Sequence, residues 1–156
     1  MVLPLNFFVV EKEKQYDLLY RQLSALLEGE TDTVAKMANM AAAINEAFGF
    51  WWTGFYRVAG EELILGPFQG PVACMHIPFG KGVCGTAWAR EASVVVPDVE
   101  AFPGHIACSS ASRSEIVVPV HAPDGTVTAV LDIDSDKLAT FDDIDKVWLE
   151  KIVKLL

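Results

Sequence analysis

The chain has 156 residues, of which 52% are hydrophobic and 21% are charged, and its formal net charge is −9 at pH 7. This length suffices for one domain with a two- or three-layer core, and the hydrophobic fraction excludes an intrinsically disordered chain. The acidic balance offers no basic face for phosphates, so binding to nucleic acid or to an anionic membrane is disfavoured.

The N-terminal stretch 2–10 is apolar and is followed at once by the charged run 11–14. It has no basic leader or small-residue cleavage site, and it is too short to span a bilayer. We therefore expect residues 1–11 to form an N-terminal extension of a single domain that covers residues 1–156. We also expect a cytoplasmic location, where cysteines stay reduced unless catalysis oxidises them.

Two amphipathic helices are expected first. Apolar residues at helical spacing over 12–28 predict one helix. The next helix is expected to start at Thr31 and Asp32, where Asp32 can cap the free amides, and to end at Gly49, which suits a left-handed stop.

From residue 50 the pattern becomes that of β-strands. We expect strands at 50–58, 63–65, 72–78, 94–96, 115–121 and 126–134, and a short helix at 86–90. The last two strands form a hairpin across the turn 123–125. A closing amphipathic helix is expected from Asp142, with Thr140 as its N-cap. This order predicts an α+β fold with a central, mostly antiparallel sheet of about six strands flanked by helices.

Three cysteines, Cys74, Cys84 and Cys108, are an odd number, which favours thiol chemistry over a disulfide scaffold. Cys84 lies among glycines near a predicted helix start, where free amides and the helix dipole favour a thiolate. Cys108 lies in the irregular stretch 97–114, and Cys74 lies within the predicted strand 72–78. Burial as a small hydrophobic residue stays an alternative for each of them. Because no Cys and His spacing typical of metal ligands occurs, we expect no metal site.

A second candidate group is formed by carboxylates. Asp132 and Asp134 alternate along one strand and should share a face, about 6 to 7 Å apart, and Glu115 on the hairpin partner could join them. Two carboxylates at that distance repel by about 2 to 3 kcal/mol at an effective dielectric near 20. One of them is expected to hold its proton tightly, as a general acid must. A solvated sheet edge is the alternative.

Aromatic side chains give a third candidate group. Trp52 and Tyr56 are four residues apart on a strand and share a face. Such a face could form the wall of a pocket for a methylthio group, because sulfur contacts aromatic rings favourably. A simple core role is equally compatible with the pattern. His105, three residues before Cys108, is the one histidine near a thiol and could tune it.

These segments occur in an order that resembles one known family. The motifs are LGPFQG at 65–70, AC at 73–74, GKGVCGTA at 80–87, GHIAC at 104–108, SEIVVP at 114–119 and LDIDS at 131–135. From about Gly54 to the C-terminal helix, the chain resembles the free methionine-(R)-sulfoxide reductases, which are stand-alone GAF-domain enzymes. The resemblance implies a GAF-like fold and thiol-dependent reduction of free L-methionine-(R)-sulfoxide to methionine.

The resemblance also implies roles for individual residues. Cys108 would be the nucleophile, Cys84 the resolving thiol and Cys74 an auxiliary thiol. An exchange of Cys84 and Cys108 stays open, because Cys84 has the stronger helix-terminus argument. The acids Glu115, Asp132 and Asp134 would supply the proton and bind the ammonium group of the substrate. Trp52 and Tyr56 would also bind the substrate.

In the implied reaction, Cys108 becomes a sulfenic acid and then forms a disulfide with Cys84, which thioredoxin or a similar reductant would reduce. No metal or organic cofactor is needed. The sequence leaves open whether the chain forms a homodimer. A regulatory GAF module that binds a nucleotide or another small metabolite is the alternative function, although an acidic site would repel a phosphate.

Overall fold

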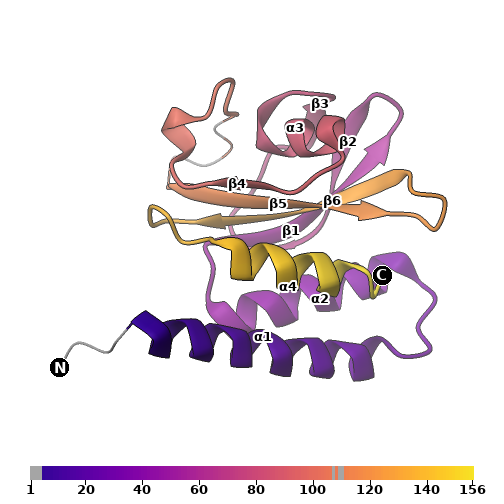
Figure 1. Cartoon of the computed structure of the whole chain (residues 1–156). Coiled ribbons are helices and arrows are strands. Elements are labelled where there is room, and N and C mark those ends of the chain that lie inside the picture. The colour runs from indigo at the N-terminus through magenta and orange to yellow at the C-terminus, as the bar shows by residue number, and fades with distance from the viewer. Residues whose placement is uncertain (1–4, 107, 109–110) are drawn as a thin grey trace.

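The computed structural model describes residues 5–106, 108 and 111–156. Within these residues, six strands form one sheet in the order β3-β2-β1-β6-β5-β4, and every neighbouring pair is antiparallel. Helices α2 and α4 lie against one face of the sheet, α1 packs on the outer side of these two helices, and α3 lies on the other face of the sheet (Figure 1). The predicted α+β fold with a central antiparallel sheet is confirmed.

The elements follow in chain order. They are α1 (Leu5–Leu27), α2 (Thr33–Phe48), β1 (Trp52–Ala59), β2 (Glu62–Gln69), β3 (His76–Pro78), α3 (Gly82–Arg90), β4 (Val94–Val96), the 3-10 turn η1 (Val99–Ala101), β5 (Ser114–His121), β6 (Val127–Ser135) and α4 (Asp143–Val153). Among the residues described, no helix is long and apolar enough to cross a membrane.

The helix ends agree with the sequence in one case and differ in two. At α2, the Asp32 side chain accepts from the Ala35 amide, and Gly49 adopts the left-handed conformation at φ 66°, as predicted. Helix α1 begins at Leu5, earlier than residue 12, so it takes in part of the stretch 1–11. The domain division itself stays a prediction.

The N-cap predicted for the last helix is wrong. Asp142, not Thr140, caps α4, because the Asp142 side chain accepts from the backbone of Asp145 while the Asp145 side chain accepts from the backbone of Asp142. The hydroxyl of Thr140 hydrogen-bonds instead with that of Ser135 at 2.6 Å.

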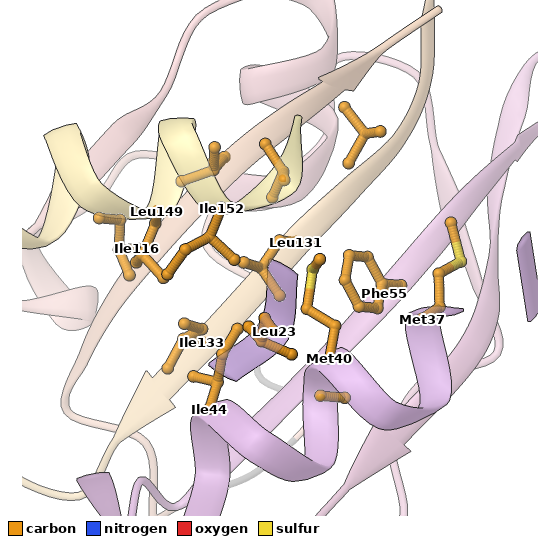
Figure 2. Close-up of a cluster of buried hydrophobic side chains, with 14 of the residues drawn as sticks. Leu23, Met37, Met40, Ile44, Phe55, Ile116, Leu131, Ile133, Leu149 and Ile152 are labelled. Carbon is orange, nitrogen blue, oxygen red and sulfur yellow. The ribbon is translucent and has the colours of Figure 1, made fainter. Parts of the chain in front are cut away.

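The sheet separates two apolar layers. Alternate residues of the central strands face α1, α2 and α4 and form the larger core. Figure 2 shows its members Leu23, Met37, Met40, Ile44, Phe55, Ile116, Leu131, Ile133, Leu149 and Ile152. The residues between them on the strands face α3, and there they meet Val83 and Ala87. Because side chains alternate along a strand, the face that meets α3 is also the one that carries Trp52, Tyr56 and Asp132.

A buried polar contact ties α1 to α4 in the helical layer. The Tyr16 hydroxyl donates to Asp145 Oδ1 at 2.6 Å, and the Lys12 ammonium pairs with Asp145 Oδ2. This contact lies on the face of the sheet opposite to α3, away from the predicted site residues (Figure 1).

Candidate active site

Strand pairing brings the three predicted carboxylates together. Glu115 on β5 is directly opposite Asp134 on β6, and Val117 is opposite Asp132. Glu115 therefore lies beside Asp134 and diagonal to Asp132, and the three acids share the face of the sheet that α3 covers.

These acids are enclosed, so the alternative of a solvated sheet edge is wrong. Glu115 is 6% exposed and Asp132 is 5% exposed, while Asp134 is half-buried. Burial raises the pKa of the Glu115 carboxyl well above its usual range, and the charges of Asp132 and Asp134 raise it further. Burial and Asp132 likewise raise the pKa of Asp134. A carboxyl group that holds its proton more tightly than a solvated one, as the sequence predicted, is therefore present in this cluster.

Cys84 lies in the first turn of α3, close to the helix start as predicted, but the expectation of a thiolate is wrong. The side chain is 4% exposed. Burial raises the pKa of the Cys84 thiol well above its usual range, and the neighbouring Asp132 and Glu115 raise it further. Loss of solvent and two nearby negative charges therefore outweigh the helix dipole.

The cysteines pair differently from the prediction. Cys74 and Cys108 form a disulfide, with their Cα atoms 5.4 Å apart, and Cys84 is the free thiol. The predicted Cys84–Cys108 bridge is not the one the structure contains. Cys74 also lies outside strand β3, in the segment that leads to it, and the first backbone hydrogen bond to β2 in this segment is the one that the Met75 carbonyl oxygen accepts from Leu65. The predicted position of Cys74 within a strand is thus wrong, and the residue is free of the sheet to reach Cys108.

The two aromatic residues predicted to line the pocket also hydrogen-bond to the chain segment that carries Cys74. Trp52 Nε1 donates to the carbonyl oxygen of Pro71 at 3.0 Å, and the Tyr56 hydroxyl donates to the carbonyl oxygen of Cys74 at 2.9 Å. The two rings stack with centroids 5.9 Å apart. A methyl group in place of one α-hydrogen of Gly54, which lies between them on β1, would come within 2.4 Å of Phe68 Cβ and 2.6 Å of the Trp52 ring. Two aromatic side chains of β1 thus hold the segment that carries Cys74.

All of these groups meet at one cavity of about 40 Å³ between the sheet, α3 and the cysteine-bearing segments. Predicted site residues that line it are Trp52, Tyr56, Cys84, Cys108, Glu115, Asp132 and Asp134. Cys74 does not line the cavity but is bonded to Cys108, which does. Every residue predicted for the site is therefore at this cavity or joined to it.

Two further polar residues lie at the same cavity. His105 Nε2 is 4.0 Å from Glu115 Oε1, and burial lowers the pKa of the imidazole against the opposing charge of Asp132. The Ser112 hydroxyl donates to Asp134 Oδ1 at 3.3 Å. The sequence indicated His105 only as a neighbour of Cys108, and it gave no signal for Ser112, whose contact depends on the path of an irregular segment.

Comparison with known proteins assigns the family. The family profile described as "GAF domain" matches residues 28–156. An Escherichia coli protein named free methionine-R-sulfoxide reductase is 44% identical over 148 residues, which cover 94% of this chain and 89% of that protein. The chain belongs to the free methionine-(R)-sulfoxide reductase family. The resemblance seen in the sequence is thereby confirmed, together with the GAF fold and the oxidoreductase class.

Two further relatives support this assignment. GAF domain-containing protein A of Dictyostelium discoideum is 56% identical over 146 residues, covering 93% of this chain and 92% of that protein. The X-ray structure of free methionine-R-sulfoxide reductase from Neisseria meningitidis in complex with its substrate is 53% identical, with a TM-score of 0.90, and covers 92% of this chain and 87% of that one. Similarity therefore extends over nearly the whole chain and includes the cavity.

Proposed function

We propose that this protein reduces free L-methionine-(R)-sulfoxide to methionine through a sulfenic acid on Cys108. The observation that carries the proposal is the cavity, where the Cys108 segment lies over three acids, two of them fully enclosed, in a chain of the reductase family. The Neisseria meningitidis relative is described in complex with its substrate, which supports the same substrate for this chain.

In the first step, the Cys108 thiolate attacks the sulfoxide sulfur, the sulfur–oxygen bond breaks, and the oxygen is transferred to Cys108. Methionine leaves as the thioether, and Cys108 is oxidised to a sulfenic acid. We assign Glu115 as the acid that protonates the oxygen, because burial and both neighbouring aspartates raise the pKa of its carboxyl group.

The aspartates suit the ammonium group of a free amino acid. Asp132 and Asp134 are two residues apart on β6, at the floor of the cavity. A charge-assisted hydrogen bond contributes about 1.5 to 3 kcal/mol, so two such bonds favour the free amino acid by about 10² to 10⁴. A methionine sulfoxide within a peptide has no ammonium group beside its side chain and gains neither bond.

We assign Cys74 as the resolving thiol, in place of Cys84. The Cys74 thiol attacks the Cys108 sulfenic acid, a disulfide forms and water leaves. The support is the Cys74–Cys108 disulfide itself. With this bond closed, the Cys108 sulfur is no longer a free thiolate. The oxidised protein must therefore be reduced before it can attack another substrate.

An external dithiol such as thioredoxin would restore the two thiols by exchange, because both cysteines of the disulfide are only half-buried. The alternative of a GAF module that binds a nucleotide finds no support in the cavity. Three acidic groups line it, and they would repel a phosphate.

The test is consumption of NADPH with thioredoxin, thioredoxin reductase and free methionine-(R)-sulfoxide. We expect turnover with the R epimer, little with the S epimer, and none after Cys108→Ser. Absence of turnover with thioredoxin and also with dithiothreitol would refute the proposal.

Mass spectrometry of unreduced protein after exposure to substrate tests the thiol roles. We expect a Cys74–Cys108 bridge in the unsubstituted protein and in the matched control Cys84→Ser, and a sulfenic acid that dimedone traps in Cys74→Ser. A dominant Cys84–Cys108 bridge would overturn the assignment of Cys74.

A further inference from the structure

The reaction proposed above leaves Cys84 without a part, although its thiol lies at the centre of the acidic cluster. Its Sγ, one carboxylate oxygen of Glu115 and one of Asp132 all lie within 4.8 Å of one another. These three donors come from α3, β5 and β6, and each residue is at least 94% buried. The spacing of these residues along the sequence does not indicate this group, because only the fold brings the three elements together.

One atom of the cluster indicates a missing ligand. Asp132 Oδ1 is buried and has no hydrogen-bond partner among the residues that the structure describes. A buried carboxylate oxygen without a partner is unfavourable, so it requires an explanation. Because Asp132 lines the cavity, a positively charged ligand there would satisfy this oxygen.

The sulfur and oxygen donors of this cluster indicate which kind of cation it would bind. A thiolate and carboxylates together suit a borderline-soft divalent cation of the zinc class, with bonds of about 2.0 to 2.3 Å. Bonds of that length place neighbouring donors of a tetrahedral site about 3.3 to 3.8 Å apart. The cluster therefore needs only small side-chain movements, and His105 beside Glu115 offers a nitrogen as a further donor.

The charge of the cluster points the same way. Two carboxyl groups and a thiol face one another away from solvent, and a dication is attracted by such donors and displaces the protons from them. The cavity that these donors line also reaches Asp132, so a cation could enter beside it.

We propose that Cys84, Glu115 and Asp132 form an inhibitory site for a divalent cation of the zinc class, whose occupancy excludes the substrate ammonium group from Asp132. The metal site itself does not depend on the proposed reductase reaction, whereas the exclusion of substrate rests on it.

The direct test is titration with Cd²⁺ of the protein in its Cys74–Cys108 disulfide form, in which Cys84 is the one free thiol. We expect one equivalent to produce the ultraviolet charge-transfer band of a cadmium thiolate. The band should be lost in Cys84→Ala, and the affinity should fall at least tenfold in Asp132→Asn. The control Glu62→Gln, at an exposed acid on the outer strand β2, should bind as the unsubstituted protein does.

Absence of the band, or stoichiometric cadmium binding that survives Cys84→Ala, would overturn the site. Near-ultraviolet circular dichroism of each variant establishes that it is folded, and Asp132→Asn keeps the shape of the side chain if Cys84→Ala is not folded.

Exclusion of the substrate is tested in the double variant Cys74→Ser/Cys108→Ser, which keeps Cys84 and cannot turn over. Free methionine-(R)-sulfoxide should bind this variant in calorimetry and should displace cadmium from it. If the substrate binds the metal-free variant but leaves the cadmium band unchanged, the inhibitory role is refuted. If the substrate does not bind at all, the proposed function fails while the cadmium band still decides the metal site.

Discussion

Replacing Tyr56 by phenylalanine should slow formation of the disulfide while leaving the first chemical step nearly unchanged. The hydroxyl donates to the carbonyl oxygen of Cys74 at 2.9 Å, and Tyr56 is 2% exposed. Burial and the charge of Asp132 raise the pKa of Tyr56 well above its usual range, so the hydroxyl stays a donor at neutral pH. Phenylalanine keeps the ring that lines the cavity and removes only this contact.

The expected magnitude follows from that single hydrogen bond. Its net contribution is about 0.5 to 1.5 kcal/mol, so the fraction of molecules with the Cys74 segment correctly placed should fall by about 2- to 12-fold. The rate at which Cys74 captures the sulfenic acid should decrease by the same factor.

A rapid-quench single turnover separates the two steps, because methionine release reports the first and loss of the dimedone-reactive sulfenic acid reports the second. Tyr16→Phe is the matched control. It removes a hydroxyl contact to Asp145 in the helical layer, so it should lower the free energy of unfolding by about 1.5 to 3 kcal/mol without changing the ratio of the two rates. Equal slowing of both steps by Tyr56→Phe would refute a role in positioning Cys74.

Three further predictions concern stability and the shape of the site. The free energy of unfolding should fall as the pH rises from about 4 through the raised pKa values of Glu115, Asp132 and Asp134. The reason is that the folded state binds more protons than the unfolded state in this range. Urea unfolding at several pH values measures the dependence, and Asp134→Asn should make it weaker. Gly54→Ala should lower stability by about 1 to 3 kcal/mol and raise the KM for sulfoxide, because the new methyl group clashes with Phe68 Cβ on β2 and displaces the Trp52 ring. An unchanged KM in the folded variant would show that the ring does not shape the site. Leu131→Ala, in the opposite layer, should cost about 2 to 5 kcal/mol in thermal or urea unfolding and should leave the KM of the folded protein unchanged.

The parts of the fold that the sequence predicted well depend on local chemistry. Asp32 caps the start of α2 and Gly49 ends it, as their residue types favour, and the turn at 123–125 joins β5 to β6. The predictions that failed depend on competition between neighbours. Thr140 is a good capping residue, but Asp142 and Asp145 form a reciprocal pair and start α4 there instead.

At the site, alternation along β6 was sufficient to place Asp132 and Asp134 on one face, and hairpin pairing added Glu115. Whether that face was buried depended on α3 packing over it, which no local pattern reveals. The same packing raised the pKa of the Cys84 thiol. A helix start by itself favours a thiolate, but in the folded chain this one lies against two carboxyl groups.

The sequence by itself determined the family, the α+β architecture and the set of groups that meet at the site, because ordered motifs and side-chain alternation are properties of the chain. Only the tertiary structure decided which cysteine reaches Cys108 and which thiol remains free. The segment that carries Cys74 is held by Trp52 and Tyr56 from a strand some twenty residues earlier, and such a contact has no local signal. The tertiary structure also brought Cys84, Glu115 and Asp132 together from three separate elements, and this proximity of a thiol and two carboxyl groups has no counterpart in their spacing along the chain.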